Sequence, residues 1–374
     1  MPASETTTTV PPPARYMAAT PSLAGPRPRP RSLQFALFLA AIAWFNCARP
    51  LAQSAADVLD LRLGLGDMHP LVASLLLLLL VVFGLSLLRS IEHRRAPLRL
   101  ALGLPRRATS RAEWATGAAI GWGLAVASVL PMVLARSLDV QLWTAPRAWF
   151  LLSLSLLTLA CATLAQALAI YGYGFQRLIE ATGPVRAALV LIALVAIDAA
   201  VTQTPDGTPD GSRIVVAILA SLLLCLCWFR THGLWLLWGL HFAWAVSTAL
   251  LFGLPIAGDT SFTSVVDTRV TGPLWLTGGN YGPAAAAFSV LLLLAAIPIL
   301  IRVTGDYAWD YTHPPIIPGG YDVTIAPPAA HVAMEQAAQT AQPAGPASLV
   351  QILPVATPPP LPAPPTGNQS PDSN

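Results

Sequence analysis

The sequence predicts an all-α fold: a polytopic transmembrane bundle of about eight helices, with a disordered tail at each end. Of the 374 residues, 55% are hydrophobic and only 10% are charged, whereas a soluble chain carries about a quarter charged residues. Several apolar runs approach or exceed the roughly 20 residues that cross a bilayer core. Because lipid offers no partners to backbone N–H and C=O groups, we expect each apolar run to be a helix.

Eight apolar runs are long enough to be considered as spans. They cover residues 33–52, 70–88, 115–135, 149–170, 187–203, 214–229, 233–253 and 284–302. Two of them are imperfect, because Asn46 and Arg49 interrupt the first and Asp198 lies within the fifth.

The placement of arginine predicts the orientation of the bundle. The chain contains no lysine, and the connection between the second and third spans holds a run of arginines: Arg89, Arg94, Arg95, Arg99, Arg106, Arg107 and Arg111. The positive-inside rule places this connection in the cytoplasm. Alternation along the chain then puts both termini in the cytoplasm, and it puts the Asp-bearing loops 53–69, 136–148, 204–213 and 254–283 outside.

The two ends of the chain have a different composition from the spans. Residues 1–32 are rich in Thr, Pro and Arg and lack the pattern of a cleavable signal peptide. Residues 303–374 are rich in Pro and Ala, and such a composition cannot bury a core. We therefore expect disordered cytoplasmic tails over 1–32 and 303–374, flanking N-terminal transmembrane helices over 33–148 and a second helical region over 149–302.

Ionisable side chains inside a membrane span are costly, and each one is a functional hypothesis. Only Asp198 and His241 lie deep in the core spans, and Gln166 in the fourth span is the most notable neutral polar residue. A histidine and an aspartate that meet across helices form either a general base with its orienting carboxylate or a buried pair that holds the bundle together. From the chemistry alone, the structural role is favoured over catalysis.

The sequence favours neither a metal site nor a cofactor. One histidine and one distant aspartate fall short of the three or four convergent ligands that a metal needs. The cysteines all lie in apolar segments, where they are expected to act as small lipid-compatible residues: Cys47, Cys161, Cys225 and Cys227. We predict no metal, no cofactor and no nucleic-acid partner, and we expect the lipid bilayer as the surroundings.

Three stretches between the fourth and eighth spans resemble the CPBP family of intramembrane endopeptidases. Residues 233–258, GLWLLWGLHFAWAVSTALLFGLPIAG, resemble the family's third motif, a histidine followed by an asparagine and an LFGxPxxG turn. Residues 272–288, GPLWLTGGNYGPAAAAF, resemble its GPxWLTGG-x-x-GPE segment, and 171–184, YGYGFQRLIEATGP, its region after motif one. The family includes type II CAAX prenyl endopeptidases and bacterial Abi proteins. The resemblance implies a CAAX-protease-like core over 149–302.

The motif positions at which that family carries its catalytic groups are largely changed. The EExxxR motif reads QALAIY here, so that Gln166 and Ala167 replace the glutamates and Tyr171 replaces the arginine. An amide has no useful basicity and alanine has no polar group, so neither can take a proton from water. The sequence therefore predicts that the first motif no longer activates water.

The later motifs are changed as well. The FxxxH motif should fall in 191–203, where no histidine occurs and Asp198 stands near the expected place. In motif three, His241 matches the family's histidine, whereas Ala245 replaces its asparagine one helical turn later. The glutamate of the GPE triplet is Ala284. Asp198 is expected in the outer half of its span, far from His241.

These matches and losses lead to three hypotheses. The first is a catalytically impaired member of the family, a pseudoprotease that binds a membrane-bound protein or peptide. The second is an active intramembrane endopeptidase in which Asp198 or, on a cytoplasmic loop, Glu180 replaces the lost carboxylates. The third is a small transporter or channel, which broken helices or an inverted repeat would support. The resemblance and the lack of an organelle-targeting sequence favour a bacterial cytoplasmic membrane.

Overall fold

A computed structural model describes residues 30–91, 97–142, 146–202, 208–305 and 307, together with 333–334, 336–337 and 340. The chain divides into two units, Met1–Pro314 and Pro315–Asn374. The tails expected over 1–32 and 303–374 lie almost entirely outside the described residues.

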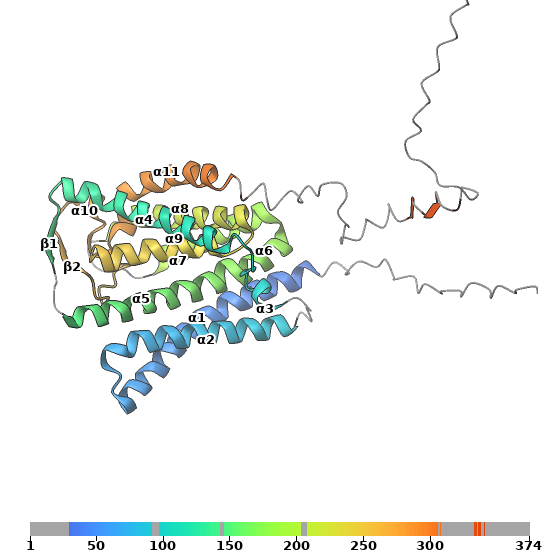
Figure 1. Cartoon of the computed structure of the whole chain (residues 1–374), viewed down its shortest axis with the longest axis horizontal. Helices are drawn as coiled ribbons and strands as arrows, with labels where there is room; N and C mark the ends of the chain where they lie inside the picture. Colours follow the sequence, from blue (N-terminus) through green and yellow to red (C-terminus); the bar gives the residue numbers. More distant parts are fainter. Residues whose placement is uncertain are drawn as a thin grey trace, which may run out of the picture. The chain divides into compact units, whose positions relative to one another are not determined.

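Within the first unit, long apolar helices lie side by side, as expected for a membrane bundle (Figure 1). Six segments are long and apolar enough to cross a membrane, namely Arg31–Leu63, Gly66–Ile91, Ser110–Leu134, Trp149–Thr182, Pro184–Val201 and Asp210–Thr231. Two shorter apolar helical segments, Trp235–Leu251 and Ala287–Val303, occupy the places of the last two expected spans. The main helices are α1 (Arg31–Leu63), α2 (His69–Ile91), α4 (Ser110–Leu134), α5 (Pro146–Gln166), α6 (Phe175–Thr182), α7 (Pro184–Val201), α8 (Asp210–Thr231), α9 (Trp235–Val246) and α11 (Ala287–Val303).

The first helix is longer than the sequence predicts. The segment 53–69 was expected to be a loop, but α1 continues through it to Leu63 and accommodates Pro50 in its interior. The helix ends where Gly64 takes a left-handed conformation, with φ 64°, which a residue without Cβ adopts at little cost. The 3-10 turn η1 (Gly66–Met68) then leads directly into α2.

The fourth span is also longer than expected. The segment 171–186 was predicted to be a cytoplasmic loop, but the helix continues from α5 through a π-helical segment, η2 (Ala167–Gly174), into α6. Gly172 permits this course, because a Cβ there would lie 2.5 Å from the carbonyl oxygen of Leu102. A second π-helical segment, η3 (Ser247–Leu251), follows α9. Such π segments are rare and often occur at functional sites.

Glycines bring α4 and α9 into backbone contact. A Cβ on Gly117 would lie 2.0 Å from the carbonyl oxygen of Leu236, and one on Gly121 would lie 2.2 Å from that of Leu240. From the other helix, a Cβ on Gly239 would lie 2.2 Å from the carbonyl oxygen of Trp114. Small residues at a helix interface allow this close approach in membranes, where packing replaces the hydrophobic effect. We call this contact the glycine seam.

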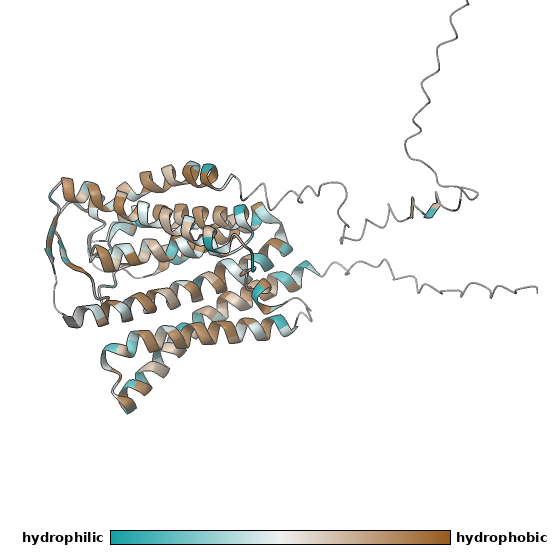
Figure 2. Cartoon of the chain, viewed as in Figure 1, coloured by the Kyte–Doolittle hydropathy of each residue, from teal (hydrophilic) through white to brown (hydrophobic). Residues whose placement is uncertain are grey.

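A small sheet closes one end of the bundle. The strands β1 (Leu138–Leu142) and β2 (Val266–Val270) pair antiparallel, with Leu138 opposite Val270 and Leu142 opposite Val266. This end is opposite the one at which α1 begins and α11 ends (Figure 1). Apolar residues dominate the long helices, whereas polar residues gather toward helix ends and on the strands (Figure 2). The short helices α3 (Leu98–Ala101) and α10 (Leu274–Thr277), with the 3-10 turns η4 (Gly279–Tyr281) and η5 (Pro283–Ala285), lie in the connections.

At the other end of the bundle, arginine side chains tie separate helices together. Arg107 donates hydrogen bonds to the carbonyl oxygens of Thr231, at 2.5 Å, and of His232, at 3.5 Å, where α8 ends. Arg230 donates to the hydroxyl of Thr304 at 3.0 Å, just after α11. Because the last carbonyls of a helix have no partners within it, the bonds from Arg107 satisfy backbone groups at the end of α8. The bond from Arg230 ties α8 to the residue that follows α11.

Candidate functional site

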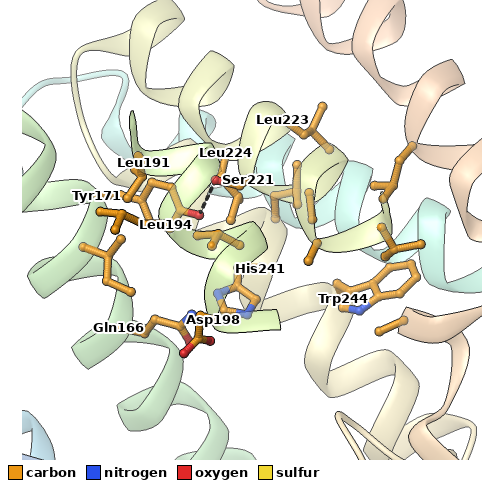
Figure 3. A pocket seen from close by; sticks show the side chains of 18 of the residues that line it. Gln166, Tyr171, Leu191, Leu194, Asp198, Ser221, Leu223, Leu224, His241 and Trp244 are labelled. Atoms are coloured by element: carbon orange, nitrogen blue, oxygen red, sulfur yellow. Dashed lines mark hydrogen bonds between the residues drawn. The ribbon is translucent and has the colours of Figure 1, made fainter. Parts of the chain in front are cut away.

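One cavity, of about 340 Å³, is lined by residues of α1, α4, α5, η2, α7, α8, α9, η5 and α11. Its walls are mostly apolar, and its polar lining comes from separate helices (Figure 3). The polar side chains are Asn46, Arg49, Gln166, Tyr171, Asp198, Ser221, His241 and Ser289. The cavity therefore gathers the ionisable residues that the sequence places within the apolar spans.

The glycine seam determines which side of α9 faces the cavity. Gly239 and the backbone of Leu240 meet α4, and the next side chain, His241, lines the cavity together with Trp244. The imidazole is half-buried. Within the part of the chain that the structure describes, it makes no hydrogen bond and no ion pair of 4.0 Å or less. His241 is thus held by its helix alone and presents its ring to the cavity.

The positions that match the first motif divide between the cavity and the packed interior. Gln166 and Tyr171 line the cavity, and the Tyr171 hydroxyl donates a hydrogen bond of 3.5 Å to that of Ser221 (Figure 3). Ala167 is 1% exposed and is absent from the lining, as is Ala245, which is 3% exposed. Of the two positions that resemble the family's glutamates, only Gln166 contributes a polar group to the cavity wall.

Asp198 lies in the same cavity as His241, which differs from the expectation that the two residues lie in separate parts of the bundle. In Figure 3, Asp198 is drawn in the same part of the cavity as Gln166 and His241. The carboxylate does not form an ion pair of 4.0 Å or less with the imidazole. Its residue is exposed, near the end of α7. The two groups therefore share the cavity without an ion pair between them.

Glu180 and Ala284, two further positions considered in the sequence, differ in whether they line the cavity. Glu180 forms an ion pair of 2.9 Å with Arg177 and does not line the cavity, so it does not replace the lost glutamates there. Arg177 itself is buried and also donates to the side-chain oxygen of Gln34, at 3.2 Å. By contrast Ala284, the position matching the glutamate of the GPE triplet, does line the cavity.

Arg49 is the functional candidate that the sequence analysis passed over. It was considered only as an interruption of the first span, yet it lines the same cavity as His241. An arginine within an apolar span is itself an indication of a functional position, because its charge is costly there. Within the described residues no group of three or more His, Cys, Asp or Glu side chains is placed to hold a metal ion, and the four cysteines are unpaired.

The chain was compared with protein-family models, with curated proteins and with solved structures. None of them matches it.

Proposed function

We propose that the chain is a CAAX-protease-like integral membrane protein that is catalytically impaired and binds a membrane-bound protein or peptide. The observation that carries this proposal is the convergence of matched positions. Gln166, His241 and Ala284 are distant in sequence, each matches a position of a different motif, and all three line one cavity. Chance similarity of three short stretches gives no reason for such convergence.

The chemistry of the lining supports an impaired site. The position of the first glutamate carries an amide, the position of the second is a buried alanine outside the cavity, and the GPE glutamate is an alanine. A hydrolase needs a group that removes a proton from water, and His241 would have to do so without a hydrogen-bonded carboxylate. Binding requires only the shape and polarity of the cavity, which remain.

Site-specific photo-crosslinking in membranes tests the binding proposal. A photoreactive amino acid at Leu194, which lines the cavity, should form adducts with a polypeptide. Leu189 is the matched control, because it lies on the same helix, is 62% exposed and is absent from the lining. Equal adducts from both positions, or no polypeptide adduct from Leu194, would contradict the proposal. Cleavage of a bound polypeptide that stops in His241→Ala would instead show an active enzyme.

An active endopeptidase is the second candidate, and the position of Asp198 favours it. Asp198 shares the cavity with His241, and a bridging water could connect the carboxylate to the imidazole. In this reaction water, with its proton transferred to His241, adds to the peptide carbonyl, and the leaving amine takes up the proton. Purified protein would then cleave a membrane peptide, and Asp198→Asn and His241→Ala would each abolish cleavage.

We further propose that the protein lies in a bacterial cytoplasmic membrane with both termini inside. Arginine enrichment between α2 and α4 supports this orientation. A reporter that is active only in the cytoplasm should be active when fused to the C-terminus. A reporter that is active only in the periplasm should be inactive at the same place. The reverse result would contradict the orientation.

A further inference from the structure

Arg49 and Asp198 are opposite charges on two walls of the cavity, on α1 and α7. Both side chains line this cavity, yet within the described residues the two do not form an ion pair of 4.0 Å or less. Within the described residues the guanidinium has a ring contact, 4.5 Å from its central carbon to the centre of the Phe45 ring, and the carboxylate has no hydrogen bond. The two opposite charges line one cavity and do not pair with each other, so that a single bound molecule can contact both.

Arg49 lines two cavities that differ in their lining residues. The same side chain also lines a second cavity, of about 490 Å³, together with Gln53, His69, Ser74 and Asp259. The first cavity continues from Arg49 past leucines and valines: Leu124, Val195, Val216, Leu223, Leu224, Leu240 and Leu293. Arg49 therefore lies between a cavity of mixed lining and one whose walls are mostly apolar, an arrangement that suits the charged headgroup of an amphiphile.

We propose that Arg49 and Asp198 bind the zwitterionic headgroup of an amphiphile whose hydrocarbon chain occupies the apolar part of the cavity. The guanidinium binds the anionic group, for which its planar set of donors is suited, and the carboxylate binds the ammonium. A net-neutral headgroup satisfies both charges at once, whereas an anionic headgroup satisfies Arg49 and is repelled by Asp198. An ethanolamine phospholipid of the bilayer has this chemistry.

This inference goes beyond the proposed peptide binding and does not rest on it. Arg49 belongs to α1, outside the region of motif resemblance, and a lipid could bind whether or not the chain cleaves a peptide. The two proposals also have separate readouts, since adducts with a polypeptide test one and bound lipid tests the other.

Native mass spectrometry of the purified full-length protein measures the binding of added phosphatidylethanolamine and of phosphatidylglycerol with the same acyl chains. We expect phosphatidylethanolamine to bind about tenfold more tightly, a difference typical of one charge-assisted contact. Arg49→Gln and Asp198→Asn should each reduce its binding by about the same factor. Arg186→Gln, an exposed arginine at the start of α7 that does not line the cavity, should leave it unchanged.

Two further measurements locate the lipid and identify its source. Phosphatidylethanolamine with brominated chains should quench tryptophan fluorescence, and the quenching should be smaller in Trp244→Phe, because Trp244 lines the cavity. If free phosphoethanolamine displaces the lipid, the charge pair recognises the headgroup alone, and a soluble zwitterion is then the source. The proposal would be overturned if phosphatidylethanolamine and phosphatidylglycerol bound equally tightly. It would also be overturned if phosphatidylethanolamine bound equally tightly to Arg49→Gln and to the wild type. The variants are compared only when they elute as monodisperse folded protein.

Discussion

The glycine seam and the cavity lie on two sides of the same helix, and they are built in opposite ways. On one side of α9, Gly239 meets α4 so closely that no added Cβ would fit. On the other side, His241 and Trp244 face a space that neighbouring helices do not fill. The seam fixes α9 through backbone contact, and this rigidity allows the opposite face to carry groups that do not contribute to packing. The packed face and the cavity-lining face are therefore separate on one helix.

The largest effect should come from filling the seam. Gly121→Leu places a side chain where a Cβ already lies 2.2 Å from the carbonyl oxygen of Leu240, and backbone cannot move aside. We expect a loss of at least about 3 kcal/mol, the upper range of overpacking, seen as a lower unfolding temperature in detergent and as aggregated protein. Gly123→Leu is the matched control on α4, because nothing lies within 4 Å of a Cβ there. Similar losses in both variants would show that the seam is not special.

The sequence predicts the number and type of the helices because apolar length alone determines what crosses a bilayer. It does not predict where α1 and α6 end, because the continuation past residue 52 and through 171–182 depends on packing and on π-helical segments. A motif comparison selected His241 and Gln166, and the structure places both at the cavity. It could not show that Ala167 is packed away or that Asp198 shares the cavity, since these follow from helix rotation.

An intermediate loss of stability should distinguish substitutions at two adjacent residues, Gln166 and Ala167. Gln166→Glu places a carboxylate at the cavity, and we expect it to cost less than about 1 kcal/mol. Ala167→Glu places one where the residue is 1% exposed, and we expect a cost of about 3 kcal/mol or more, because a buried charge without a partner is strongly destabilising. Unfolding in mixed detergent micelles measures the difference. If both substitutions lowered the free energy of unfolding equally, Gln166 and Ala167 would not differ in their surroundings as described.

The smallest effect concerns His232, which lies outside the spans where α8 ends. Burial lowers the pKa of this imidazole below its ordinary value, and the nearby Arg107 lowers it further. The unfolded chain therefore binds a proton more readily than the folded one. The contribution of His232 to stability is present above the unfolded pKa, about 6.5, and is lost as the pH falls below it.

His232→Asn separates this effect from the other titrating groups. The residue has φ 46°, a conformation that asparagine tolerates better than most side chains. Between pH 7 and pH 5 the wild type should lose slightly more stability than the variant, by less than about 1 kcal/mol because the side chain is partly exposed. If the unfolding temperatures of the wild type and of His232→Asn change by the same amount between pH 7 and pH 5, the protonation of His232 is not coupled to folding. The end of α8 would then be held by the hydrogen bonds of Arg107 independently of pH.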